Sequence, residues 1–323
     1  MAAHSIVYLD ANYLSNMAKA RLGQLNEVHD PQFWLRLYQE LYIAVCEDRI
    51  MCPALDLQIE EASFDTRIVS EVCDIVSSLS VAGTLTSYTA VVEQRVLEAA
   101  VRFLGRGGES PRTSHAMRAG GSRPSIWDKA STATGRQGLR SVARRIRSQV
   151  VEYERRKKAK WAATGLQRYK HYSAIGWTEA LRREKESYVD AVLGAWGQDE
   201  GKDSVRRLQT RLGELGMGRG EFEQFKGSPH LMDEPIVDVE CSVRAATARY
   251  SRSRRQRGSD LRDAAILGCT IPNCDMVTTD RFMKQLVTEH LGLDARYGCE
   301  VYSARKADRL RFERRISEST MAC

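Results

Sequence analysis

Several features that define common protein classes are missing from this sequence. None of its eight cysteines belongs to a C-x-x-C pair, and no apolar run approaches the roughly 18 residues that a membrane helix needs. The first residues, MAAHSIVYLD, lack the charged start and long apolar stretch of a signal peptide. We therefore expect a soluble, cytoplasmic protein without a membrane partner, whose thiols are reduced and mostly buried.

The motifs of several enzyme classes are also missing. The six histidines lie outside the acidic motifs described below, so their positions give no support to histidine-relay catalysis. No glycine-rich segment ends in G-K-[ST], as a P-loop does. The stretch DANYL has Asn12 where haloacid dehalogenase phosphatases need a second aspartate. The paired acid and late lysine of a response-regulator receiver do not occur in order either.

What the sequence does contain is a large apolar fraction and a basic surplus. The chain has 323 residues, 42% of them hydrophobic, which suits one large domain or a core with an accessory domain. Its 49 Lys and Arg against 42 Asp and Glu give a net charge of +7. This charge permits a polyanionic partner without requiring one.

The chain divides into three zones of different composition. Up to about residue 104, strand-like runs (SIVYLD, RIMCPAL, GTLTSYTA) alternate with helical apolar spacing. Residues 105–230 are polar and basic, and they begin with the Gly- and Ser-rich loop GRGGESPRTS. From residue 231 the first pattern returns, with the strand-like runs DMVTT and CEVYSA. We predict an α/β core of residues 1–104 and 231–323 with a mainly parallel central sheet, interrupted by a mostly helical, basic insertion of residues 105–230.

Carboxylates stand at the ends of the expected core elements. Asp10 and Asp280 each close a strand, and Asp260 and Asp263 lie three apart near a helix start. Because the carboxyl ends of parallel strands meet at one edge of a sheet, these acids are candidates for a shared site. Glu60 and Glu61 open a further helix after the second strand-like run.

Each of these acids also has an ordinary structural interpretation. An aspartate after a strand often forms a turn or caps a helix, and Glu60, Glu61 and Asp260 could be solvated helix positions. Several carboxylates in one site would repel one another, a cost that a divalent cation offsets. Oxygen ligands suit Mg²⁺ or Mn²⁺, and no His or Cys pattern among these acids favours zinc.

The order of these motifs resembles that of the PIN-like nuclease superfamily. The motifs are VYLDANYLS, then the acidic pair in MCPALDLQIEE, then SDLRDAAILGCTIPNCDMVTTDRF. The resemblance covers about the first hundred and the last ninety residues, and it implies a three-layer α/β/α core. It implies that Asp10, Glu61, Asp263 and Asp280 are the catalytic, metal-binding acids, with Glu60 as an alternative to Glu61. It further implies that Asp260 is an auxiliary metal-binding carboxylate and that Asn12 and Ser15 steady the first loop.

Two basic segments are candidates for nucleic-acid binding. One lies in the insertion and contains Arg155, Arg156, Lys157 and Lys158 with interleaved aromatic residues, a composition that suits phosphate contacts and base stacking. A solvated helix or a protein-docking surface are the alternatives for it. The other segment contains Arg252, Arg254, Arg255 and Arg257 just before Asp260, where it could guide phosphate toward the acids or form a surface loop.

The sequence therefore predicts a divalent-metal-dependent nuclease, because carboxylate-held cations activate water and neutralise the charge that develops on a phosphodiester. The resemblance favours RNA over DNA, and it implies an endoribonuclease that acts on single strands. The alternative is a catalytically silent PIN-like module that binds nucleic acid or docks a protein. The sequence leaves open a protein partner or inhibitor and a homo-oligomer.

Overall fold

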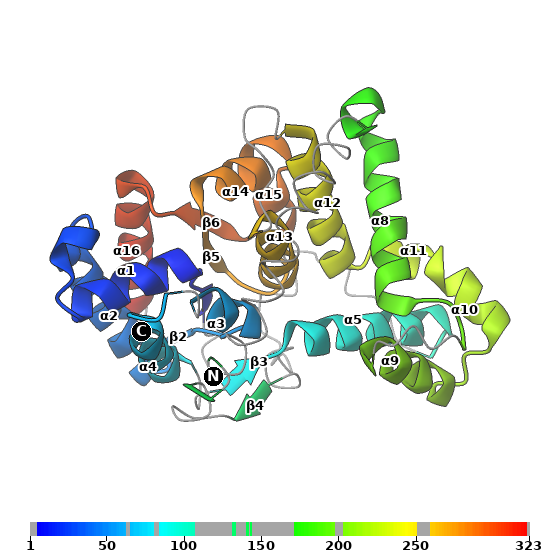
Figure 1. Cartoon of the computed structure of the whole chain (residues 1–323), viewed down its shortest axis with the longest axis horizontal. Coiled ribbons are helices and arrows are strands. Elements are labelled where there is room, and N and C mark those ends of the chain that lie inside the picture. Colours follow the sequence, from blue (N-terminus) through cyan, green and yellow to red (C-terminus); the bar gives the residue numbers. More distant parts are fainter. Residues whose placement is uncertain are drawn as a thin grey trace. The chain divides into compact units, whose positions relative to one another are not determined.

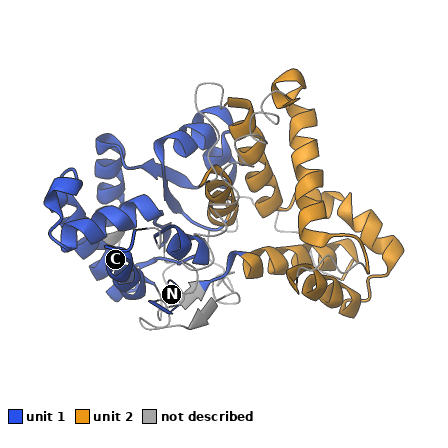
Figure 2. Cartoon of the chain, viewed as in Figure 1, with its two compact units in different colours: residues 1–88, 120–159, 273–323 blue, residues 89–119, 160–272 orange. Residues whose placement is uncertain are grey.

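The computed structural model describes residues 5–62, 65–80, 84–106, 131–133, 140–141, 143, 171–197, 203–250 and 259–321. The chain forms two compact units (Figure 2). The first comprises Met1–Tyr88, Gly120–Ala159 and Asn273–Cys323, and the second comprises Thr89–Ala119 and Lys160–Pro272. Each unit is discontinuous in sequence, and both ends of the chain belong to the first.

The first unit alternates short strands with helices along the chain (Figure 1). Its N-terminal elements are β1 (Ser5–Tyr8), α1 (Ala11–Arg21), the 3-10 helix η1 (Leu25–Glu27), α2 (Pro31–Cys46), β2 (Ile50–Met51), α3 (Asp56–Ala62), α4 (Val69–Leu79) and β3 (Thr84–Thr86). Its later elements are β4 (Ser131–Ala133), β5 (Met276–Thr279), α14 (Arg281–Gln285), the π-helical turn η5 (Leu286–His290), α15 (Leu293–Tyr297), β6 (Glu300–Ser303) and α16 (Lys306–Met321).

A four-stranded parallel sheet organises this unit, with strand order β2-β1-β5-β6. The central strands are almost wholly buried, as the β-branched, apolar runs of parallel strands usually are. The expected mixture of helices with a mainly parallel sheet is confirmed, although helices predominate. The strand expected in GTLTSYTA forms as β3, but it pairs antiparallel with β4 and stays outside the parallel sheet.

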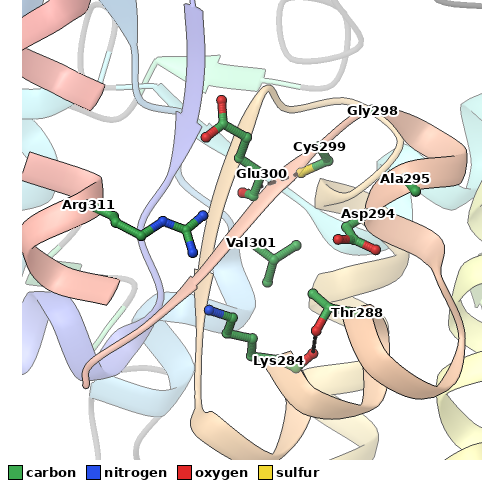
Figure 3. Close-up of a pocket in the computed structure, with 9 residues that line it drawn as sticks. All are labelled: Lys284, Thr288, Asp294, Ala295, Gly298, Cys299, Glu300, Val301 and Arg311. Atoms are coloured by element: carbon green, nitrogen blue, oxygen red, sulfur yellow. Dashed lines mark hydrogen bonds between the residues drawn. The ribbon is translucent and has the colours of Figure 1, made fainter. Parts of the chain in front are cut away.

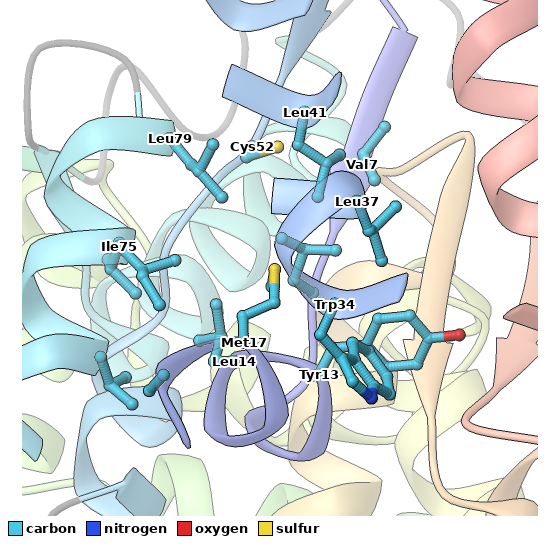
Figure 4. Packing of buried hydrophobic residues seen from close by; sticks show 14 of the residues in the cluster. Val7, Tyr13, Leu14, Met17, Trp34, Leu37, Leu41, Cys52, Ile75 and Leu79 are labelled. Atoms are coloured by element: carbon cyan, nitrogen blue, oxygen red, sulfur yellow. The ribbon is translucent and has the colours of Figure 1, made fainter. Parts of the chain in front are cut away.

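An aromatic cluster anchors the helices of the first unit (Figure 4). Trp34 of α2 packs edge-on against Tyr13 of α1, with ring centroids 5.1 Å apart. Tyr13 also packs against Phe312 of α16, and all three rings are buried. The Tyr13 hydroxyl donates a 2.9 Å hydrogen bond to the carbonyl of Ser303 at the end of β6. The start of α1 is therefore fixed to the last strand of the sheet.

The second unit is built from helices in the part that the structure describes. They are α5 (Tyr88–Phe103), α8 (Trp177–Leu193), α9 (Asp203–Glu214), α10 (Arg219–Lys226), α11 (Pro229–Met232), α12 (Pro235–Tyr250) and α13 (Ser259–Thr270). Helices α12 and α13 pack closely at Gly268, where a Cβ atom would lie 2.8 Å from the Cβ of Glu240. The glycine allows this approach because it has no side chain.

The boundaries of the units differ from the predicted domain boundaries. The sequence pattern placed residues 231–272 with the α/β core, whereas α12 and α13 belong to the helical second unit. Residues 131–133, within the predicted insertion, supply a strand to the first unit. The described cysteines are free, and all but Cys46 are buried. Among the described helices, none has both the length and the apolar character needed to cross a membrane.

Candidate active site at the carboxyl edge of the sheet

Two of the predicted acids follow neighbouring strands at one edge of the parallel sheet. Strands β1 and β5 pair with Tyr8 opposite Val277, so Asp10 and Asp280 both come just after the last paired residues. The Asp10 N–H donates a 2.7 Å hydrogen bond to the hydroxyl of Thr278, which joins the two strand ends directly. Both residues as a whole are half-buried. The sheet thus places together two residues that are far apart in the sequence.

Each of these carboxylates caps a helix. Asp10 Oδ1 accepts the N–H groups of Asn12 and Tyr13 at 2.8 and 3.1 Å, at the start of α1. Asp280 Oδ1 accepts the N–H of Met283 at 2.7 Å, at the start of α14. The capping interpretation of both residues is therefore correct. It does not exclude a second role, because capping fixes the orientation of a carboxylate that could also bind a ligand.

The predicted supporting residue Asn12 contacts the first acid. Its side-chain amide donates to Asp10 Oδ2 at 3.1 Å, in addition to the backbone contact. Ser15 lies on the next turn of α1 and is half-buried. The role predicted for Ser15 stays a prediction.

The environment of Asp10 disfavours its charged form. The pKa of the Asp10 carboxyl is raised from 3.8 to about 6. Burial is the main cause and the negative charge of Asp280 adds to it, while hydrogen bonds from Tyr13 and Asn12 partly offset the rise. A carboxylate that is desolvated beside a second carboxylate is stabilised by a cation. The chemistry of this pair therefore fits a hard divalent ion with oxygen ligands.

Helix α3 lies against the chain just before Asp10. The buried Gln58 side chain donates a hydrogen bond to the Leu9 carbonyl. Glu61 is three residues after Gln58 and shares its face of the helix, whereas Glu60 is turned about 200° from Gln58. The helix geometry therefore favours Glu61 over Glu60 as the acid on the Asp10 side, and its role as a metal ligand stays a prediction.

The remaining predicted acids belong to the second unit. Asp260 and Asp263 lie in the first turns of α13, where Asp260 is 1% exposed and Asp263 is half-buried. The interpretation of Asp260 as a solvated helix position is wrong, because its side chain is inside the protein. The metal-binding roles of Asp260 and Asp263 stay predictions from the sequence.

Among the residues that the structure describes, no three His, Cys, Asp or Glu side chains form a group that could hold a metal ion. The acids that the structure brings together at the sheet edge are Asp10 and Asp280. The two basic segments expected to bind nucleic acid, with Arg155, Arg156, Lys157 and Lys158 in one and Arg252, Arg254, Arg255 and Arg257 in the other, lie outside the described residues.

Comparisons with family models, curated proteins and solved structures find no match to this chain. The arguments about function therefore rest on the residues themselves.

A pocket of about 470 Å³ lies elsewhere in the first unit (Figure 3). It is lined by the first residues of β6, by the preceding α15 segment, by Lys284 and Thr288, and by Arg311 of α16. None of the predicted site residues lines it. It opens beside the amino end of β6, whereas Asp10 and Asp280 follow the carboxyl ends of β1 and β5.

Sequence reasoning missed two residues that position the acids. Thr278 and Gln58 hold the backbone at Asp10 and Leu9, and both side chains are buried. Thr278 stands two residues before Asp280 in a strand, so it shares a face with that acid, and this alternation is the signal that could have identified it. Gln58 offers no comparable signal, because its partner is a distant backbone carbonyl.

The raised pKa of Asp10 predicts a pH-dependent stability in metal-free buffer. Between pH 3.8 and about 6 the native protein holds a proton on Asp10 that the unfolded chain has lost. The free energy of unfolding should therefore fall as the pH rises through this window, and the destabilisation should be complete above it. Urea unfolding of the parent and of Asp10→Asn with chelator at pH 4.5 and 7.5 measures this. The free energy of unfolding of Asp10→Asn minus that of the parent should be larger at pH 7.5 than at pH 4.5. The same value at both pH values would contradict the assigned environment of Asp10.

Proposed function

We propose that this chain is a divalent-metal-dependent nuclease that hydrolyses phosphodiester bonds, with single-stranded RNA as the favoured substrate. The observation that carries the proposal is the pairing of Asp10 and Asp280 at the carboxyl edge of adjacent parallel strands. In open parallel sheets, ligands bind at this edge. A PIN-like three-layer arrangement of the first unit's sheet and helices is part of the same proposal.

Mg²⁺ or Mn²⁺ at this edge would supply a nucleophilic water and charge neutralisation at the phosphate. Asp10 and Asp280 would hold the ion through carboxylate oxygens, with Glu61 as the candidate third acid. Asn12, Thr278 and the capped N–H groups keep the two carboxylates in place before the substrate arrives. This arrangement is preorganised, so little reorientation is needed in the transition state.

A second candidate function is a PIN-like module that binds nucleic acid or a protein without cleaving anything. The two helix caps favour it, because they account for Asp10 and Asp280 without any metal. This module would need no cation, so metal dependence separates the two candidates.

The test is cleavage of a 5′-labelled, unstructured RNA by the full chain, with single-stranded DNA of the same sequence beside it. After treatment with chelator we expect no cleavage, and added Mn²⁺ or Mg²⁺ should restore it while Zn²⁺ should not. Cleavage that survives chelation would contradict the metal mechanism. Binding without cleavage under all conditions would support the second candidate.

A further inference from the structure

Most described arginines on the surface of the first unit are paired with acids. Pairs with N–O distances from 2.5 to 2.9 Å are Arg21–Glu71, Arg36–Glu313, Arg67–Glu27, Arg140–Asp74 and Arg315–Glu300. Each of these pairs offsets the charge of the arginine that it contains. A cation without such a partner in this unit is therefore unusual and identifies a place where an external anion could bind.

Arg314 of α16 and three other exposed cations depart from this pattern. The three others, Arg281, Arg305 and Lys306, follow the ends of β5 and β6 and are named the edge cations here. All three side chains are exposed. None of them forms an ion pair with an acid of the described part of the chain, whereas Lys284, one turn after Arg281, is paired with Asp308 at 2.5 Å. Their charges are thus available to solvent.

The sheet topology brings the edge cations to the carboxyl edge. Strands β5 and β6 are parallel neighbours with Thr279 opposite Ser303. Arg281 is the first residue of α14, directly after Asp280, and Arg305 and Lys306 follow the end of β6. The three cations therefore come from two segments that leave the sheet side by side, next to Asp280.

Internal contacts hold these two segments together. Asp308 Oδ1 pairs with Lys284 of α14, and Asp308 Oδ2 accepts the N–H and hydroxyl of Ser303 at 3.1 and 2.5 Å. Asp308 and Ser303 are buried. The ion pair thus ties the last turn of α14 to the first turn of α16, and it holds together the two helices that carry or follow the edge cations.

We infer that Arg281, Arg305 and Lys306 bind consecutive phosphate groups of single-stranded nucleic acid beside Asp280. The choice of nucleic acid rests on the proposed function, whereas the anion preference rests on the unpaired charges. Arginine and lysine contact phosphate without reading the bases, so these contacts position the strand without selecting its sequence. A backbone held along the β5–β6 side would lie next to Asp280.

The test is binding of fluorescein-labelled oligouridylate to the full chain in chelator, measured by anisotropy over a range of KCl concentrations. The variant Arg281→Gln/Arg305→Gln/Lys306→Gln loses three contacts at about 0.7 each, so the slope of log K against log [KCl] should become shallower by about 2. The control Arg36→Gln/Arg67→Gln/Arg315→Gln has the same net charge but removes paired arginines. Its slope should stay close to that of the parent.

The outcomes separate this inference from the proposed function. An edge variant with the slope of the parent, or a parent that does not bind oligouridylate, would overturn the phosphate contacts. A shallower slope in the edge variant alone supports them, even if the parent never cleaves RNA. Equal losses in the edge variant and the control would show a net-charge effect and would also overturn the inference. Circular dichroism melts of the three proteins establish that they are folded alike.

Discussion

Replacing Asp10 with Asn is expected to lower metal-dependent RNA cleavage by at least about a hundredfold. Loss of a group that merely supports a metal ligand costs about 10- to 100-fold, and loss of the ligand itself should cost more. Asparagine caps helices as well as aspartate does, so the start of α1 should stay intact and the change should report on charge. The measurement is the single-turnover rate at saturating Mn²⁺, for this variant and for Asp280→Asn.

The matched control is Asp30→Asn, which makes the same substitution at another helix cap. Asp30 caps α2 through the N–H of Phe33 and is not a predicted ligand. We expect normal cleavage from it and a normal rise in melting temperature with Mn²⁺, whereas Asp10→Asn should lose most of that rise. An Asp10→Asn protein that cleaves at the parent rate would show that the carboxylate is only a cap. Glu61→Gln and Glu60→Gln, compared in the same assay, identify the third acid.

Replacing Trp34 with Ala is expected to reduce the free energy of unfolding of the first unit by about 3 to 5 kcal/mol. Trp34 is 2% exposed and packs against both Tyr13 and Phe33, so truncation leaves a cavity between α1 and α2. The measurement is urea unfolding followed by circular dichroism. A loss below about 1 kcal/mol would mean that the cluster rearranges to fill the space.

The control for this substitution is Ile43→Ala on the same helix. Ile43 is 51% exposed, so its truncation should change the free energy of unfolding by no more than about 0.5 kcal/mol. Trp34→Ala should also weaken Mn²⁺ binding, because Trp34 packs against Tyr13. Tyr13 in turn bonds Asp10 through its N–H and Ser303 through its hydroxyl, so a shift of Tyr13 would displace Asp10. Ile43→Ala should leave Mn²⁺ binding unchanged.

The parts of the fold that the sequence predicted are those with a local pattern. The apolar runs at Ser5–Tyr8, Met276–Thr279 and Glu300–Ser303 are strands, and the aspartates after the first two stand at the sheet edge. Residues 57–79 have helical apolar spacing throughout, yet they form two separate helices, α3 and α4. Asp65 accounts for the break, because its side chain bonds the N–H of Arg67 and competes with helical hydrogen bonding.

Features that depend on distant contacts could not be predicted in this way. Strand β3 pairs with Ser131–Ala133, a short segment whose composition gives no strand signal. The burial of Asp260 follows from the packing of α13 and not from its neighbours in sequence. Likewise, the basic segments that the sequence predicts to bind nucleic acid consist of cations that are close together along the chain. Among the edge cations, Arg281 is distant in sequence from Arg305 and Lys306 and becomes their neighbour only when β5 and β6 pair.

The strand order also governs when the acid pair can exist during synthesis. Asp10 emerges early from the ribosome, but its partner strand β5 follows it by 268 residues along the chain, counted from Asp10 to Thr278. An incomplete chain can pair β1 with β2 and pack α1 on α2, yet it has no second carboxylate at the edge. A truncated or stalled product that ends before β5 would therefore lack the pair of Asp10 and Asp280. Any activity that needs both carboxylates therefore depends on the synthesis of β5.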